Sequence, residues 1–146
     1  MMQLTRYTEA ANHVFRDAQV LMQELHHTQL DVEHIFLAMI RQPEGLAHRA
    51  LERLGLVPDE VQVVVGHELD RMPRAYSSHH GFSMSQVYLT PRVQRLMKRA
   101  EQEARRLQDQ YISTEHLLIA LASEREGASA RILNRSGISQ ERSWRC

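Results

Sequence analysis

Two stretches of ten residues decide the fold of this chain: residues 31–40, DVEHIFLAMI, and residues 113–122, STEHLLIALA. Both carry the step Glu-His at the same place, at residues 33–34 and 115–116. After this step each stretch is apolar on all sides, a pattern typical of a helix that is buried all round. Each stretch therefore predicts a helix in the middle of the fold, beginning just after its first one or two residues.

The two stretches belong to an internal duplication. Residues 7–56 superimpose without a gap on residues 89–138, at a constant offset of 82 residues. Identical residues at this offset are Thr8 and Thr90, Ala18 and Ala100, Leu25 and Leu107, Leu51 and Leu133, and Gly55 and Gly137. A register kept over this length indicates two copies of one supersecondary unit.

Each copy begins with an amphipathic helix. Thr8 or Thr90 opens it, because a threonine hydroxyl can accept a hydrogen bond from the unpaired N–H groups of the first turn. Pro91 suits the first helical position. The apolar stripe, at spacings of three and four, is Ala11, Val14, Phe15, Ala18, Met22 and Leu25 in one copy and Val93, Leu96, Met97, Ala100, Ala104 and Leu107 in the other.

Two shorter helices complete the copy. A third helix is predicted over residues 46–54 and 128–135, ending at Gly55 or Gly137, where glycine suits a left-handed C-cap. A fourth starts at Pro58 in the first copy and would start near Ser139 in the second.

Residues 71–88 carry prolines, glycine and several serines without periodicity, and they predict an exposed linker. The prediction is a single all-α domain over residues 1–146, made of two tandem pseudo-symmetric four-helix repeats: repeat one 5–70, linker 71–88 and repeat two 89–146.

Composition agrees with an all-α fold and excludes functions that need a strong net charge. Only 5% of the residues are aromatic, while residues that lose little freedom in a helix abound. With 18 Lys and Arg against 18 Asp and Glu, no net field attracts the chain to nucleic acid or to a membrane.

Cys146 is the one cysteine and cannot form an intramolecular disulfide, and no leading stretch resembles a signal peptide, so we expect a cytoplasmic protein.

Several segments of the second copy resemble the repeat of Clp N-terminal domains, which belong to AAA+ unfoldases. They are residues 89–92 (LTPR), 103–107 (EARRL), 111–118 (YISTEHLL) and 126–133 (EGASARIL). The first copy keeps the pattern more loosely, in residues 7–9 and 31–35, and the resemblance covers about residues 5–140. The second copy is most similar to ClpC-type domains, while residues 18–21 (AQVL) are more like ClpB.

The resemblance implies a module that sits on a hexameric ATPase ring and binds unfolded or tagged substrates or adaptor proteins. ATP and Mg²⁺ would belong to the parent ATPase, because no phosphate-binding Gly-x-x-x-x-Gly-Lys-Ser/Thr loop occurs here, so neither a cofactor nor catalysis is expected in this domain. Three alternatives stay open: a free-standing regulator without ATPase domains, a ClpB-type disaggregase N-domain, and an enzyme that uses its Glu-His steps as acid and base.

In ClpC-type domains each repeat can bind phosphorylated arginine, which implies candidate pockets at Thr8 with Glu33 and at Thr90 with Glu115. The chemistry fits, because a helix start attracts phosphate and a carboxylate binds the planar guanidinium. The alternative is that both threonines are ordinary N-caps and both glutamates complement the helix dipole. The first copy also has Val32 where the family often has Thr. We expect both glutamates to be partly exposed, so that Glu33→Ala with Glu115→Ala would abolish binding without unfolding the domain.

Other clusters carry weaker signals. The histidine pairs at residues 26–27 and 79–80 lack the spacing of a zinc site, and we expect no metal. His34 and His116 are expected beside the core with their ring nitrogens hydrogen-bonded. No nucleophile has a partner base, and acids interrupt the basic run at residues 98–106, which is typical of a solvated face. The valines at positions 61, 63, 64 and 65 either pack between the copies or line a docking groove.

Overall fold

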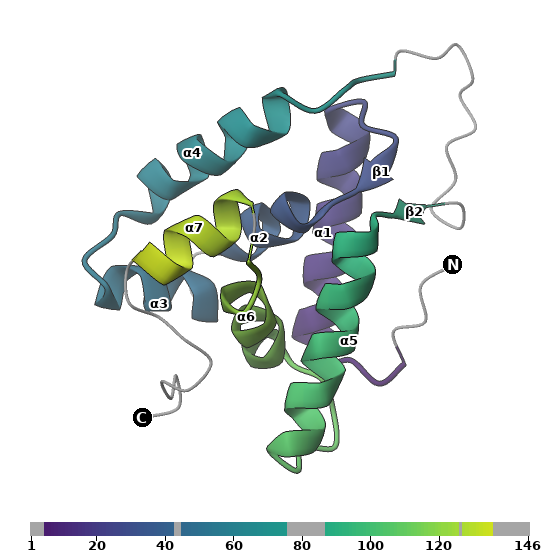
Figure 1. Ribbon diagram of the computed structural model, residues 1–146, viewed down its shortest axis with the longest axis vertical. Coiled ribbons are helices and arrows are strands. Elements are labelled where there is room, and N and C mark those ends of the chain that lie inside the picture. Colours follow the sequence, from purple (N-terminus) through teal and green to yellow (C-terminus); the bar gives the residue numbers. More distant parts are fainter. Residues whose placement is uncertain (1–4, 43–44, 76–86, 126, 136–146) are drawn as a thin grey trace.

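The computed structural model describes residues 5–42, 45–75, 87–125 and 127–135 (Figure 1). Within these ranges the chain forms α1 (Glu9–Glu24), β1 (Gln29–Leu30), α2 (Val32–Ile40), α3 (Leu46–Arg53), α4 (Pro58–Asp70), β2 (Tyr88–Leu89), α5 (Pro91–Arg106), α6 (Thr114–Ala122) and α7 (Ala128–Arg135). The all-α prediction is confirmed, with two very short strands added. The predicted C-cap at Gly137, the helix near Ser139 and most of the linker 71–88 lie outside the described residues. None of the helices in the described ranges is both long and apolar enough to cross a membrane.

The two helices that the Glu-His stretches predicted, α2 and α6, lie in the middle of the domain (Figure 1). Every residue of α2 is buried, and so is every residue of α6 from His116 onward. The long helices α1 and α5 pack on one side of this pair, while α3, α4 and α7 cover the other side. A single hydrophobic cluster contains side chains from both repeats. The repeats therefore share one core.

The helix α3 ends as its glycine predicted. Gly55 has a φ of 79°, a left-handed conformation that side chains disfavour. Its N–H donates to the Glu52 carbonyl at 3.0 Å, and the Leu56 N–H donates to the Leu51 carbonyl at 2.9 Å. These two bonds form a Schellman motif, which turns the chain into α4.

The valines of α4 differ in their burial. Val61 and Val65 are buried in the core, with exposed fractions of 6% and 0%. Val63 and Val64 are exposed. Val61 and Val64 line an apolar groove between α4 and α7, and docking of an unfolded segment in this groove stays a prediction.

The two repeats exchange their first extended segments. Leu30 pairs in parallel with Leu89, and Tyr7 pairs with Ile112. These two pairings are equivalent at the offset of 82 residues, and each joins one repeat to the other. Because the segment before each long helix pairs with the other repeat, the start of α5 lies beside the segment that leads into α2, and the start of α1 lies beside the segment that leads into α6.

Candidate functional site

Both predicted threonines cap a long helix. The Oγ1 of Thr8 accepts a hydrogen bond from the Ala11 N–H at 3.2 Å, and the Oγ1 of Thr90 accepts one from the Val93 N–H at 3.2 Å. Thr90 also donates its hydroxyl proton to Asp31 Oδ1 at 3.0 Å, which joins it to the first repeat. The N-cap role, the alternative that the sequence left open, is therefore present at both helix starts.

Glu33 lies at the start of α5, not at the start of α1 in its own repeat. Its two carboxylate oxygens accept hydrogen bonds from Nη1 and Nη2 of Arg92, at 2.9 and 3.1 Å. Ser129 at the start of α7 donates to the same carboxylate at 3.3 Å. Glu33 is only 5% exposed, so the expectation of partial exposure was wrong. The arginine side chain and α7 cover it, and neither is near it in sequence.

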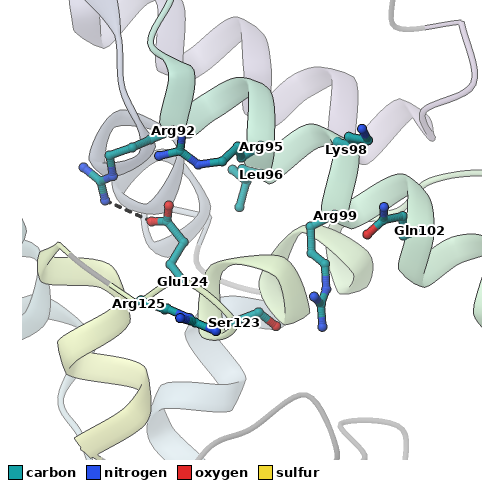
Figure 2. Close-up of a pocket in the computed structure, with 9 residues that line it drawn as sticks. All are labelled: Arg92, Arg95, Leu96, Lys98, Arg99, Gln102, Ser123, Glu124 and Arg125. Atoms are coloured by element: carbon teal, nitrogen blue, oxygen red, sulfur yellow. Dashed lines mark hydrogen bonds and ion pairs between the residues drawn. The ribbon is translucent and has the colours of Figure 1, made fainter.

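Arg92 is the centre of an acidic cluster. Besides Glu33 it pairs with Glu124 at 2.9 Å, an ion pair visible in Figure 2, and with Asp31 at 3.5 Å. Burial alone would lower the pKa of Arg92, but its hydrogen bonds with Glu33 and Glu124 raise that pKa above its usual range. Burial raises the pKa of Glu124, and the hydrogen bond from Arg92 opposes this rise. We call Thr90 and the four residues of this cluster the α5 site.

A glycine allows the cluster to close. Gly127 has a φ of 98°, and a Cβ at this position would collide with the guanidinium of Arg92 and would lie 3.0 Å from Glu33 Oε2. The chain between α6 and α7 can approach the ion pair only because this residue has no side chain. The guanidinium and carboxylate are therefore held tightly against backbone.

The second candidate site, which we call the α1 site, comprises Thr8 and Glu115 on opposite repeats. The Thr8 N–H donates to the Ile112 carbonyl at 2.9 Å, which places the start of α1 beside the segment that leads to Glu115. Glu115 is half-buried. The residue equivalent to Arg92 is Ala10, so the α1 site has no arginine at this position. The predicted within-repeat pairs, Thr8 with Glu33 and Thr90 with Glu115, are thus exchanged in the structure.

Sequence reasoning missed Arg92 and its two further acids, Asp31 and Glu124. Spacing along the chain carries no sign of this cluster, because its members come from three separate segments. A signal exists in the comparison of the two copies. The arginine and both acids have uncharged counterparts at the offset of 82 residues: Ala10, Ser113 and Gln42.

The histidines of the two Glu-His steps are buried and hydrogen-bonded, as predicted. Nδ1 of His34 accepts the Asp31 N–H at 2.8 Å, so the proton of the neutral ring is on Nε2, which donates to His27 at 2.8 Å. Nδ1 of His116 likewise accepts the Ser113 N–H at 2.8 Å. Burial, with His27 as the second cause, lowers the pKa of His34 to about 4.

One group in the described residues has metal-ligand composition. Ligand atoms of Asp109, Glu115 and His116 lie within 4.8 Å of one another. However, Nδ1 of His116 already accepts a backbone N–H, so Nε2 carries the proton and donates to Asp109 at 2.7 Å. Neither ring nitrogen offers a lone pair, and the group does not fit a metal ion in this protonation state. The pair at residues 79–80 lies outside the described residues.

Comparison with protein families gives a match over most of the chain. The family described as the Clp repeat (R) N-terminal domain matches residues 6–136. ClpC/MecB of Bacillus subtilis, a negative regulator of genetic competence, is 37% identical over 139 residues. The chaperone protein ClpB of Oceanobacillus iheyensis is 34% identical over 142 residues. Each alignment covers 94% of this chain but only 16% of the relative, so the chain spans about one sixth of their length.

Solved structures show the same fold. The N-terminal domain of the ClpV1 ATPase from E. coli EAEC superimposes with a TM-score of 0.76 at 23% identity, covering 94% of this chain and 80% of that one. At this identity the likeness concerns the fold alone. It confirms the predicted architecture, since that domain shares the helical arrangement described above.

Proposed function

The chain belongs to the Clp repeat N-terminal domain family, and from this premise we propose that it captures unfolded or tagged proteins, or the adaptors that carry them, for a Clp ATPase ring. No ATPase domain is evident in the chain, so ATP and Mg²⁺ would act in the parent protein and the mechanism here is binding. The residues His34 and His116 are 0% and 1% exposed, which opposes the acid–base enzyme alternative because a substrate could not reach their rings. A free-standing regulator and a ClpB-type N-domain would use the same surfaces.

We further propose that phosphoarginine is one recognised tag, bound at the exchanged pairs. The observation that supports this is the position of each helix start beside the acid-bearing segment of the other repeat. At the α1 site, free N–H groups and the positive dipole end of α1 would bind the phosphate. The carboxylate of Glu115 would bind the guanidinium with paired hydrogen bonds.

The two sites differ in the second residue of their long helix, Arg92 in α5 and Ala10 in α1. At the α5 site the guanidinium of Arg92 holds both oxygens of Glu33, at 2.9 and 3.1 Å. A phosphoarginine would have to displace this arginine, at the cost of a buried ion pair. At the α1 site Ala10 stands in place of the arginine. We therefore assign the tighter binding to Thr8 and Glu115.

Calorimetric titration with free phosphoarginine, with arginine and phosphate as controls, tests this assignment. We expect Glu115→Ala to remove the tighter site. Ala10→Arg should also block it, because the new side chain would bring to Glu115 the guanidinium that Arg92 brings to Glu33. Ala10 is exposed, so the substitution leaves the core intact. Unchanged binding in both variants would refute the α1 site as a phosphoarginine receptor.

A second surface suits unfolded segments rather than tags. The groove between α4 and α7 has a volume of about 540 Å³ and is lined mainly by apolar side chains: Leu56, Val57, Val61, Val64, Ala128 and Ile132. Val57 and Val64 are 51% and 49% exposed, which favours a docking role. Val64→Asp should weaken binding of a reduced, unfolded test protein in a pull-down while phosphoarginine binding persists. Equal capture by the variant would exclude this groove.

A further inference from the structure

A second groove runs along α5 and is lined mainly by cations (Figure 2). Its volume is about 510 Å³. Arg92, Arg95, Lys98 and Arg99 line it from α5, and Ser123, Glu124 and Arg125 face them from the end of α6. We call this surface the basic groove. Five of its lining side chains are cationic and one is a carboxylate.

Three of these cations are available to a ligand. Arg92 pairs with Glu124 and Arg99 pairs with Glu103, so their charges are largely satisfied. In the part of the chain that the structure describes, no ion pair involves Arg95, Lys98 or Arg125, and all three side chains are exposed. Like charges gathered on one side of a groove repel one another, and an anionic ligand would relieve this repulsion.

The internal duplication shows that the fold does not require most of these cations. The equivalent positions in the first copy are Ala10 for Arg92, His13 for Arg95, Arg16 for Lys98, Asp17 for Arg99 and Pro43 for Arg125. A smaller hollow on α1, which overlaps the equivalent place in part, has a volume of about 220 Å³, and its charged lining residues are Asp17, Glu24 and Arg41. Of the five cations the first copy keeps only the one at Arg16, so the fold does not require the other four.

We infer that the basic groove binds an acidic segment of a partner protein, an extended peptide rich in Asp and Glu. Arginine side chains present forked donors that match carboxylates. The two available cations of α5, Arg95 and Lys98, lie about 5 Å apart along the helix axis, which is the length of one to two residues of extended peptide. A nucleic-acid backbone is the competing polyanion, and the experiment below measures it directly. This site goes beyond the proposed function, because it uses neither Thr8 nor Glu115.

The test is fluorescence anisotropy with a labelled peptide of ten residues rich in Glu, against a peptide with Gln at the same positions and a single-stranded DNA of ten nucleotides. We expect the Glu peptide to bind, with an affinity that falls as salt rises. Lys98→Glu should weaken binding about fivefold, and adding Arg95→Glu should raise the loss above about tenfold. Arg16→Glu is the matched control, since it makes the same charge change at the equivalent exposed position of α1.

Three results would overturn the inference. The first is no binding of the Glu peptide at low salt. The second is an equal loss in Lys98→Glu and Arg16→Glu, which would show a general charge effect. The third is tighter binding of the DNA than of the Glu peptide. Phosphoarginine binding should be unchanged in Lys98→Glu, so failure here is distinguishable from failure of the α1 site. Thermal melting of each variant confirms that it is folded.

Discussion

Replacing Arg92 by alanine should destabilise the domain more than any change to an exposed cation of the same helix. The substitution leaves the carboxylates of Asp31, Glu33 and Glu124 without their common partner. Their side chains are 16%, 7% and 13% exposed, so water cannot fully solvate them. Removing one partner of a buried ion pair costs about 3–5 kcal/mol. Because Arg92 is itself 23% exposed, we expect the lower end, about 3 kcal/mol.

Chemical denaturation at pH 7 measures this loss directly, and in thermal melting it corresponds to a fall of roughly 10 °C for a domain of this size. Lys98→Ala on the same helix is the control and should change stability by no more than about 0.5 kcal/mol. Combining Arg92→Met with Glu33→Gln should recover part of the loss, because a neutral pair replaces an unpaired charge. A loss below about 1 kcal/mol in Arg92→Ala, or strict additivity in the double variant, would refute the cluster as a stabilising contact between the repeats.

Two further predictions concern the buried polar residues. Burial lowers the pKa of His34 from 6.5 to about 4, so as pH falls the unfolded chain binds the proton before the folded chain does. The contribution of His34 to the free energy of unfolding is therefore fully present above pH 6.5. It should fall by about 3 kcal/mol towards pH 4. Urea unfolding at pH 7, 5.5 and 4.5 measures how the free energy of unfolding changes with pH. His34→Gln should reduce this pH dependence, while His13→Gln, at an exposed position, should leave it unchanged. An equal pH dependence in wild type and His34→Gln would contradict the assignment. Gly127→Ala should lower the free energy of unfolding by more than about 2 kcal/mol, because its Cβ would meet Arg92 and its φ is 98°. Gly66→Ala, with open space around it inside α4, should raise that free energy by up to about 1 kcal/mol. Similar melting temperatures for these two variants would exclude the close approach of Gly127 to Arg92.

Features set by local sequence could be predicted. The caps at Thr8 and Thr90, the glycine stop at Gly55 and the start of α4 at Pro58 depend on a few neighbouring residues, and all four are confirmed. The burial of α2 and α6 followed from their apolar composition. In each case the physical cause lies within one or two helical turns of the residue concerned.

The candidate site could not be predicted in the same way. Glu33 is in the first turn of a helix, where acids are usually solvated, yet Arg92 and Ser129 bury it from 59 and 96 residues away. The duplication showed that two equivalent helix starts exist. It did not show which acid each would face, because pairing within a repeat and pairing between repeats give the same sequence pattern.

The exchanged pairings also bear on how the chain folds. Tyr7 and Ile112 meet from about a hundred residues apart, although Leu30, the equivalent of Ile112, is much nearer along the chain. Closing the longer loop costs only about 1 kcal/mol more, since loop entropy grows slowly with length, but such non-local contacts slow folding. Repeat one alone would lack the partner for both of its extended segments. Two separate copies of one repeat could satisfy each other in the same way, as a two-fold homodimer in which each subunit completes its neighbour. The single chain carries that dimer within itself, so its two halves gain full stability only together.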